Sequence, residues 1–351
     1  MSNKKVKVDK VASVVSRLDI PDELELTTDM VAASGNAVVV RVLPVGKSNQ
    51  ELELVDGRMI KMFGGDVVVG ALGRRRALRG WPGDVPQSIQ PGDQLAILNR
   101  GGVIGKPSSD TGDTSPQACE VLGMPSINGR ILNLRDNTIP EIESLKELNL
   151  PPVVIVSGTC MQSGKTSFLS KLIQGLTKSG IRVAAGKLTG VACLRDLFAM
   201  QDNGAVRIAS FQDAGYPSTA GLDHASLVSL SKAVIADLNT ASPEVILLEL
   251  GDGLIGDYGV LDVLMDEEIR SALRVHAFCA NDLAGAWAGD RYCRDRGMTI
   301  DLYSGPVTDN AVGIEYIEAQ FKRPAVNAGR QAARMAEVVL GLLHMKNQTV
   351  S

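Results

Sequence analysis

One stretch, VVIVSGTCMQSGKTSFLSKLI from Val153 to Ile173, constrains the fold more than any other part of the chain. It begins with an apolar run typical of a buried strand. After the glycines, its apolar residues recur on one face of a helix that Gly180 would end. A loop between such a strand and helix points backbone N–H groups and a helix N-terminus at one spot, where a chain of phosphates can be held. The stretch therefore predicts a strand, a phosphate-binding loop and a helix.

The loop is longer than the common pattern GxxxxGK[ST], because five residues, TCMQS, separate its two glycines. The GKT half is intact, so Lys165 can supply a charge for the outer phosphates and Thr166 a hydroxyl for magnesium. The alternative is a glycine turn that only packs the strand against the helix. We expect a nucleotide site formed by Gly158, Thr159, Cys160, Gln162, Ser163, Gly164, Lys165, Thr166 and Ser167.

From this stretch onward, strands and helices are expected to alternate. Such alternation predicts a mostly parallel sheet covered by helices, so residues 151–351 should form an α/β domain of the P-loop type. The expected strands are PVVIVSG, IRVAAGKL, VILLELGDG, VHAFCAN and TIDLYSG. The expected helices are 165–179, about 223–239, about 260–272, 283–296, 310–320 and 328–345.

The first part of the chain has a different sequence pattern. Short apolar runs are separated by turn residues, and Asp56-Gly57 is a hairpin signal. Strands spaced this closely predict an antiparallel β-rich domain over residues 31–150, either a barrel or a sandwich. Residues 1–30 are expected to form a short helix and an acidic connector, and residues 139–152 a short amphipathic helix before the second domain.

Composition excludes several classes of protein. A length of 351 residues is more than one hydrophobic core typically serves, so two domains are expected. A net charge of -4 indicates neither a nucleic-acid nor an anionic-membrane partner. No segment reaches the ~18 consecutive apolar residues that a membrane-spanning helix needs. Five scattered cysteines without a CxxC pair indicate neither a disulfide framework nor a zinc site. We therefore expect a cytoplasmic protein with no membrane segment.

Three segments, GTCMQSGKT, VAAGKLTGVAC and VILLELGDGLIG, resemble in their order those of dethiobiotin synthetase and its relatives. That family has GTxxxxGKT, a G-x-K-P segment, and a strand-borne glutamate before a glycine pair. The resemblance covers about residues 152–330. It implies an ATP- and Mg²⁺-dependent ligase or kinase, in which Lys187 touches substrate and nucleotide phosphate and Glu249 lies near magnesium. Dimers that complete each other's sites are common in the family, so the resemblance also implies a homodimer.

The chain departs from this pattern at three positions. Cys160 replaces the aspartate of the family's loop, Leu188 replaces the proline after the lysine, and Leu250 replaces the first residue after the glutamate. Biotin-pathway chemistry is therefore not carried over.

A weaker likeness joins LLELGDGLIGDYG and VHAFCANDLAG to the VEGQGS and CHEP segments of two-domain P-loop proteins that include D-glutamate N-acyltransferases. It implies a small amino acid as substrate, and it leaves open an acyltransferase that uses the loop for the phosphates of coenzyme A.

Physical reasoning on Lys187 and Glu249 stands beside the resemblance. Both lie at the carboxyl ends of expected parallel strands, where open α/β sheets bind ligands. A lysine there can neutralise a transferring phosphoryl group, and a carboxylate can hold Mg²⁺. The alternatives are a solvated lysine, and a glutamate that caps a helix or forms a surface salt bridge. We expect Lys165, Lys187 and Glu249 to be catalytic, and Thr166 and Glu249 to hold the metal.

Other polar residues cluster at expected strand ends and could contribute to a small-molecule site. His224 could act as an acid or base, although a structural or helix-end role is an alternative, and Asp223 could simply cap the following helix. The remaining members are Asp213, Ser218, Thr219, Asp252, Asp257, Asn281 and Asp282.

An arginine-rich stretch, GALGRRRALRGWPGDVP, brings Arg74, Arg75, Arg76 and Arg79 near Trp81. Arginine forks suit carboxylates and phosphates, and an indole offers a stacking face. The stretch could deliver an anionic substrate, bind RNA, or form a solvated loop or subunit interface. Nucleic acid is not expected as a partner, because this is one patch on a chain of acidic overall charge.

The nucleotide is expected to be ATP, because CAND at Cys279 to Asp282 lacks the lysine of the N/TKxD motif that switch GTPases carry. The sequence thus predicts an ATP- and Mg²⁺-dependent enzyme that activates a small carboxylate- or amine-bearing metabolite by phosphoryl transfer. Two alternatives stay open. One is a nucleotide-dependent accessory or switch protein that acts on a protein partner, and the other is the acyltransferase.

Overall fold

The structure is a computed structural model that describes residues 4–44, 51–78, 80–109 and 115–348. The chain divides into two compact units. The first consists of Met1–Ile139, Val191–Arg195 and Phe211–Gly221; the second consists of Pro140–Gly190, Asp196–Ser210 and Leu222–Ser351. Two short segments of the second half of the chain therefore belong to the first unit, which the contiguous division expected from the sequence does not describe.

The first unit contains a closed barrel. Its ring runs through β4 (Ala37–Val42), β7 (Val67–Leu72), β10 (Val103–Pro107), β9 (Gln94–Ile97) and β11 (Gln117–Ile127), which pairs with β4 again. The pairing of β7 with β10 is parallel and the others are antiparallel, so the sheet is mixed rather than antiparallel throughout. Closure removes the exposed sheet edges that a sandwich keeps. The buried valines of β4 and β7 are part of the core.

Further strands extend or flank this barrel. Asp56 and Gly57 form the expected hairpin turn between β5 and β6, and Gly57 has a φ of 80°. The bounds of these strands are β1 (Lys4–Lys7), β2 (Lys10–Val11), β3 (Glu23–Thr27), β5 (Glu51–Glu53), β6 (Met59–Lys61), β8 (Gly83–Asp84) and β12 (Arg130–Ile131).

The prediction of a helix within residues 1–30 was wrong. β1 pairs antiparallel with β3 there, and among residues 4–30 the only helical turn is a 3₁₀ turn, Ser13–Val15. Lysine and valine alternate from Lys5 to Val8, and exposure alternates with them. A period of two is the pattern of a half-buried strand.

The helix expected within residues 139–152 was also wrong, because the segment forms only turns and bends. Prolines at both ends, Pro140 and Pro151, limit helix formation. The Glu268 carboxylate accepts hydrogen bonds from the Leu145 N–H at 2.6 Å and the Ser144 hydroxyl at 2.9 Å. The Glu268 side chain therefore binds a backbone N–H group that a helix would pair with a backbone carbonyl.

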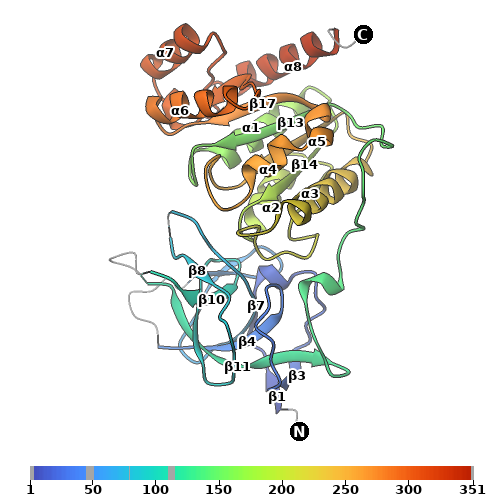
Figure 1. The fold of residues 1–351 in the computed structure, drawn as a ribbon, viewed down its shortest axis with the longest axis vertical. Coiled ribbons are helices and arrows are strands. Elements are labelled where there is room, and N and C mark those ends of the chain that lie inside the picture. Colours follow the sequence, from blue (N-terminus) through green and yellow to red (C-terminus); the bar gives the residue numbers. More distant parts are fainter. Residues whose placement is uncertain (1–3, 45–50, 79, 110–114, 349–351) are drawn as a thin grey trace. The chain divides into compact units, whose positions relative to one another are not determined.

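The second unit is built on a six-stranded, wholly parallel sheet with the order β15-β14-β16-β13-β17-β18. Figure 1 labels β14, β13 and β17 of this sheet. The unit is an α/β domain, as expected. The strands are β13 (Val153–Gly158), β14 (Val183–Thr189), β15 (Arg207–Ser210), β16 (Val245–Leu250), β17 (Leu273–Cys279) and β18 (Leu302–Ser304).

Helices connect and cover these strands. α1 packs against α8, and α3 packs against β14 and β15. The helices are α1 (Lys165–Lys178), α2 (Arg195–Asp202), α3 (His224–Asn239), α4 (Val260–Met265), α5 (Glu267–Ala272), α6 (Leu283–Arg294), α7 (Ala311–Phe321) and α8 (Ala332–Gln348). No helix in the described part of the chain is long and apolar enough to cross a membrane.

Three features of the second unit were not predicted from the sequence. β15 and α2 were not expected, and the single helix expected at about 260–272 is two helices. Asp266 separates them with an extended backbone, and its carboxylate accepts from the N–H groups of Glu268 and Ile269. An aspartate that caps a helix starts a new one rather than continuing the old.

Candidate functional site

The sheet order brings three strand ends together. β16 lies between β14 and β13, and in its register Glu249 stands beside Lys187 on one side and Val156 on the other. All three strands run in the same direction, so the loops that follow them emerge at one edge. The phosphate-loop candidate, Lys187 and Glu249 are therefore neighbours although they are far apart in the sequence.

The loop after β13 needs its glycines. A Cβ on Gly158 would lie 2.5 Å from Ser163 Oγ and 2.6 Å from the Cys279 carbonyl oxygen. Gly164, the residue before α1, has a φ of 91°, which side chains rarely adopt. Gln162 also has a positive φ, of 62°. The loop thus contains two left-handed positions, Gln162 and Gly164, and α1 starts directly after it.

Lys165 folds back over this loop. Its ammonium donates to the Cys160 carbonyl at 2.8 Å and to the Asp252 carbonyl at 2.6 Å. The residue is 5% exposed. Burial lowers the pKa of Lys165, and the nearby Glu249 carboxylate opposes that shift. The ammonium is held by neutral carbonyl oxygens, which an anionic phosphate can replace.

Glu249 and Thr166 form the second half of the arrangement. Thr166 Oγ1 donates to Glu249 Oε1 at 3.2 Å. The other oxygen, Oε2, is buried and has no hydrogen-bond partner, and the residue is only 2% exposed. Burial raises the pKa of Glu249, although Lys187 acts in the opposite direction. A buried carboxylate oxygen without a partner is costly unless a cation or a donor completes it.

These residues fit a magnesium ion. A hydroxyl and an orphaned carboxylate oxygen are hard oxygen donors of the kind that Mg²⁺ prefers. Within the described residues, no group of three or more His, Cys, Asp and Glu could hold a metal by itself. A magnesium ion at Thr166 and Glu249 would thus need further oxygens, which phosphates and water supply in nucleotide sites.

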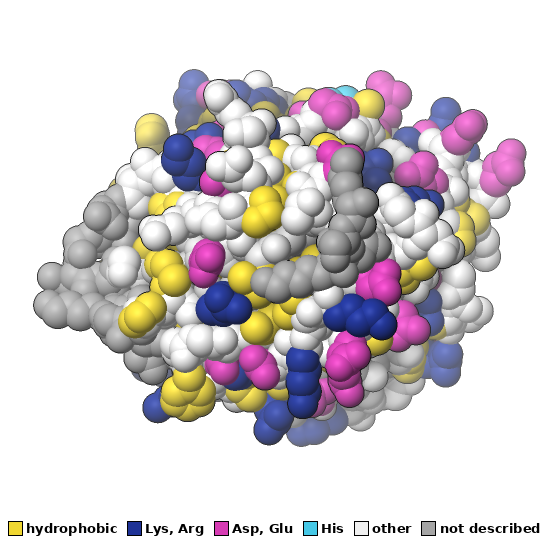
Figure 2. Space-filling view, turned by 90° about the horizontal axis from the view of Figure 1, so that it is seen from below, with side chains coloured by type: hydrophobic (Ala, Val, Ile, Leu, Met, Phe, Trp, Pro, Cys, Tyr) yellow, Lys and Arg dark blue, Asp and Glu magenta, His cyan; other side chains and the backbone are white. Residues whose placement is uncertain are grey.

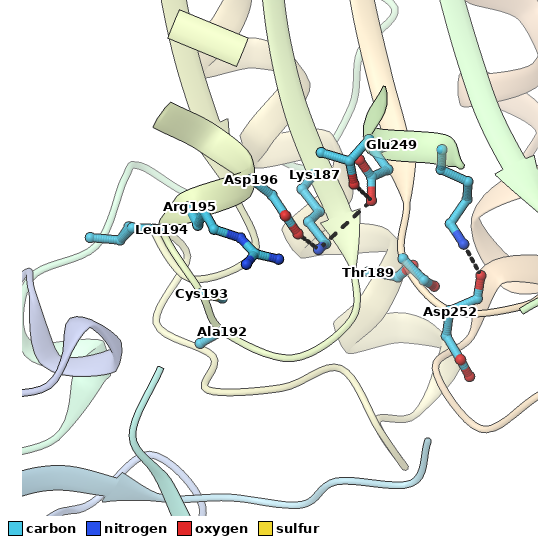
Figure 3. A network of polar contacts seen from close by, with 12 residues as sticks. Lys187, Thr189, Ala192, Cys193, Leu194, Arg195, Asp196, Glu249 and Asp252 are labelled. Carbon is cyan, nitrogen blue, oxygen red and sulfur yellow. Dashed lines mark hydrogen bonds and ion pairs between the residues drawn. The ribbon is translucent and has the colours of Figure 1, made fainter. Parts of the chain in front are cut away.

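Lys187 lies buried between two carboxylates, as Figure 3 shows. Its ammonium forms a hydrogen-bonded ion pair with Asp196 and lies 3.7 Å from Glu249 Oε1. The alternative of a solvated strand-end lysine does not fit this burial. Asp196 was missed in the sequence because it stands outside every motif. The only sequence signal for this ion pair was an acidic residue, Asp196, nine positions after the strand-end lysine.

Two glycines shape the space for the Lys187 stem. A Cβ on Gly251 would lie 2.3 Å from the Thr189 carbonyl oxygen and 3.0 Å from Lys187 Cε. A Cβ on Gly190 would lie 3.2 Å from the same Cε. Thr189 Oγ1 also donates to the Gly251 carbonyl at 3.0 Å. The loops after β14 and β16 therefore enclose the lysine stem and fix its direction.

The segment after β16 also lies against the phosphate-loop candidate. The Leu254 N–H donates to the Gly158 carbonyl at 2.8 Å, and a Cβ on Gly253 would lie 2.4 Å from the Thr159 carbonyl oxygen. Asp252 has a φ of 67°. The GDG sequence therefore allows a close backbone approach, which complements the Lys165 contact with Asp252.

The remaining residues expected in the loop differ in exposure. Thr159 Oγ1 is buried without a hydrogen-bond partner, and Cys160 Sγ accepts from Asn281 Nδ2 at 3.0 Å. Ser163 is fully buried, and its hydroxyl lies 3.4 Å from Lys165 Nζ. Gln162 and Ser167 are exposed.

Several other polar candidates have local structural roles. Asp223 accepts from the Ser226 N–H and caps α3, and Asp282 accepts from the Gly285 N–H and caps α6. His224 is exposed and its Nδ1 lies 3.0 Å from Asp262 Oδ1.

Three further candidates belong to the first unit rather than to the second. Asp213 pairs with Arg17 at 3.1 Å, and Ser218 and Thr219 are buried in a segment of that unit. Asp257 belongs to the second unit and is exposed.

The arginine-rich stretch belongs to the first unit. Arg76 forms an ion pair with Asp84 at 2.7 Å, and Arg75 is buried. Arg79 lies outside the described residues. On the face drawn in Figure 2, basic and acidic side chains are interspersed with hydrophobic ones. Arg75 is thus buried and Arg76 is paired within the first unit. The face in Figure 2 carries side chains of both charges.

Comparisons with known proteins give only a distant likeness. No family model and no curated protein matches the chain. Among solved structures, the signal recognition particle receptor FtsY from Elizabethkingia anophelis is 12% identical, with a TM-score of 0.38 over 62% of this chain and 76% of that chain. The chloroplast FtsY from Physcomitrella patens is 16% identical, with a TM-score of 0.39 over 60% and 70%. The signal recognition particle 54 kDa protein from Aeropyrum pernix K1, in complex with GDP, is 15% identical, with a TM-score of 0.37 over 58% and 48%.

At such TM-scores and identities these likenesses carry no conclusion about function. None of these proteins is named as a dethiobiotin synthetase, so that resemblance stays a prediction. What the chain can do must be argued from the residues at the sheet edge.

Proposed function

We propose that the second unit binds a nucleoside triphosphate with Mg²⁺ at Gly158–Thr166 and cleaves or transfers its terminal phosphoryl group. The observation that carries this proposal is the buried, partnerless Oε2 of Glu249 beside the Thr166 hydroxyl. Two buried ammonium groups, those of Lys165 and Lys187, lie near the same carboxylate. Two cations and a vacant carboxylate oxygen at a helix N-terminus suit a polyphosphate and its metal.

Each residue has a distinct task in this proposal. The loop N–H groups and Lys165 hold the outer phosphates, and the ammonium exchanges the Asp252 carbonyl for a phosphate oxygen. Thr166 and Glu249 would hold magnesium, which neutralises developing phosphate charge when bound. Lys187 stabilises the group that is transferred, and Asp196 orients its ammonium.

ATP is the nucleotide we propose. Asn281 and Asp282, after β17, belong to a CAND segment that lacks the lysine of the guanine-recognition motif. Asp282 caps α6, and Asn281 donates to Cys160 Sγ. These contacts give both side chains local roles, and GTP must be tested beside ATP in every measurement.

The acceptor we propose is a small carboxylate- or amine-bearing metabolite, as in a ligase or kinase that resembles dethiobiotin synthetase. The support is the position of Lys187, which stands at a strand end beside the phosphate-loop candidate and is enclosed by Gly190 and Gly251. A lysine so fixed suits a charge that develops at one defined place.

A second candidate is a nucleotide-dependent switch, and a different contact favours it. The Asp252 carbonyl accepts a hydrogen bond from Lys165 Nζ, and the Leu254 N–H donates to the Gly158 carbonyl. A phosphate that takes the ammonium would release this segment, which contains glycines at 251, 253, 256 and 259. Ile255, in the same segment, is exposed and apolar, which suits contact with a protein.

The experiment that separates the two candidates is a phosphate-release assay with ATP or GTP, with and without a pool of small carboxylic and amino acids. A ligase or kinase gives fast turnover only with the pool, whereas a switch hydrolyses slowly and ignores it. Absence of turnover under all conditions, with either nucleotide, would contradict both. Competition by acyl-coenzyme A for the nucleotide site would instead support the acyltransferase.

A further inference from the structure

A cavity of about 140 Å³ lies in the second unit beside the first half of β17. Figure 1 labels α4, α5 and β17, which supply part of its lining. The rest of the lining comes from the segment between α6 and β18, and all of it belongs to the second unit. The proposed function uses none of these residues. They are Leu264, Arg270, Leu273, His276, Gly297, Met298, Thr299 and Asp301.

This cavity has a buried floor and an exposed mouth. Leu264 and His276 are each 1% exposed, and Asp301 is 3% exposed. Arg270 and Thr299, by contrast, are exposed to solvent. A carboxylate therefore lies at the floor and a guanidinium at the mouth, so a ligand that enters meets both charges.

Hydrogen bonds hold the polar groups of the lining in place. The His276 N–H donates to Asp301 Oδ2 at 2.9 Å, and the Asp301 N–H donates to the His276 carbonyl at 2.8 Å. The His276 ring is fixed from behind, because its Nε2 lies 2.7 Å from Ser157 Oγ. Arg270 Nη2 donates to the Gly297 carbonyl at 3.2 Å. A lining that is ordered in advance pays less conformational entropy when a ligand binds.

The charges of the lining select the kind of ligand. Arg270 can pair with a carboxylate through its planar fork, and Asp301 can accept hydrogen bonds from an ammonium group. A ligand with only one of these charges would leave the opposite protein charge without its match in a partly apolar cavity, which is unfavourable. The apolar lining, formed by Leu264, Leu273 and Met298, suits a short aliphatic side chain.

The volume limits the size of the ligand. A cavity of about 150 Å³ in another protein binds benzene, so a cavity of about 140 Å³ accommodates a molecule of similar size. Alanine is such a molecule, whereas phenylalanine is clearly larger.

We propose that this cavity binds a small zwitterion, a molecule such as alanine that carries both an ammonium group and a carboxylate. The ammonium group contacts Asp301 at the floor, and the carboxylate contacts Arg270 at the mouth. The aliphatic part lies against Leu264 and Met298. The site is separate from the phosphate-loop candidate, and the inference does not depend on nucleotide binding.

The test is isothermal titration calorimetry on the full chain without nucleotide. The probes are alanine, ethylamine, propionate and phenylalanine. Ethylamine is alanine without its carboxylate, and propionate is alanine without its ammonium group, so each lacks one of the two charges. Phenylalanine keeps both charges and tests the size limit.

Three variants locate the binding. Arg270→Gln removes the charge at the mouth, and Asp301→Asn removes the charge at the floor while keeping an oxygen that can accept from the His276 N–H. Arg291→Gln is the matched control. Arg291 is an exposed arginine of the same unit that pairs with Asp295 at 2.9 Å and does not line the cavity.

We expect saturable heat with alanine for the wild type, and binding at least about tenfold weaker for the other three probes. Arg270→Gln and Asp301→Asn should each weaken alanine binding about 10–100-fold, as expected when a charged hydrogen-bond partner is removed. Arg291→Gln should bind alanine as the wild type does.

Three outcomes would overturn the inference. Absence of heat with alanine would leave a cavity that holds only water. Equal affinity for alanine and for ethylamine or propionate would contradict the need for both charges. If Asp301→Asn does not fold, Arg270→Gln decides, and an alanine affinity equal to that of Arg291→Gln contradicts the proposal. Failure of the nucleotide measurements alone would leave this inference standing.

Discussion

Thr166 Oγ1 donates to Glu249 Oε1 at 3.2 Å, so the first turn of α1 is joined to the end of β16 while the second carboxylate oxygen stays buried without a partner. The two residues are 83 positions apart, and the sheet order alone makes them neighbours. A structural hydrogen bond would satisfy one oxygen, but burying the other without a partner opposes folding. This cost is explained if the oxygen serves a cation.

Glu249→Gln should reduce phosphoryl turnover and weaken its dependence on magnesium. The amide keeps the shape and the Thr166 contact but cannot offer an anionic oxygen to Mg²⁺. We expect turnover to fall about 10–100-fold or more, the range seen when residues around a metal are changed. Turnover as a function of Mg²⁺ concentration measures it. Glu267→Gln, at an exposed glutamate in the first turn of α5, is the control and should match the wild type.

Without nucleotide, the free energy of unfolding should fall as pH rises above the ordinary carboxyl pKa. Burial raises the pKa of Glu249, so between its unfolded and folded pKa values the folded protein binds more protons than the unfolded chain. The contribution to stability is therefore complete at low pH and is lost as the carboxyl ionises. Thermal unfolding of the wild type and Glu249→Gln from about pH 5 to about pH 8 measures the difference between the two proteins. Parallel pH dependences would contradict the assigned burial effect.

Gly251→Ala should displace Lys187 and destabilise the domain. The new Cβ would lie 2.3 Å from a backbone oxygen, that of Thr189, which cannot turn aside as a side chain can. We expect a loss of about 1–3 kcal/mol in unfolding free energy, typical of overpacking, with a loss of turnover. Gly341→Ala is the matched control, because a Cβ there meets nothing within 4 Å inside α8. That change should be neutral or stabilise by up to about 1 kcal/mol.

Nucleotide should protect one cysteine from alkylation. Cys160 lies in the phosphate-loop candidate and is half-buried. Burial raises the pKa of Cys119 and Cys279 to about 12 and that of Cys293 to about 11, so these thiols should not react near neutral pH. N-ethylmaleimide labelling followed by peptide mass spectrometry should show Cys160 labelled in the free protein and protected by Mg²⁺ and ATP. Cys193, also half-buried, serves as the internal reference that nucleotide should leave unprotected. Equal labelling of Cys160 with and without nucleotide would count against a phosphate site at this loop.

The sequence predicted the second unit better than the first. The phosphate-loop candidate lies between a continuous apolar run and a helix with a clear apolar face, and both signals are local. Barrel closure depends on which strands meet, and the parallel pair β7 and β10 has no local signature. The alternating lysines and valines of residues 5–8 carry the signal of a strand, which the prediction of a helix there did not use.

Residues of the candidate site could be predicted only where a motif or a strand end marked them. Lys165, Thr166, Lys187 and Glu249 stood at such places, and the structure brings their side chains together. Asp196 stood at none. Its carboxylate pairs with Lys187 across a loop and the first turn of a helix that the sequence did not predict, so no local pattern marks it.

The central claim is that the loop Gly158–Thr166 holds nucleotide phosphates. Isothermal titration calorimetry on the wild type and on Lys165→Ala, with ATP, GTP, ADP and GDP in the presence of Mg²⁺, tests it most directly. We expect saturable heat with at least one triphosphate for the wild type and none for Lys165→Ala under the same conditions. No heat with any of the four nucleotides, or equal affinity in the two proteins, would contradict the account.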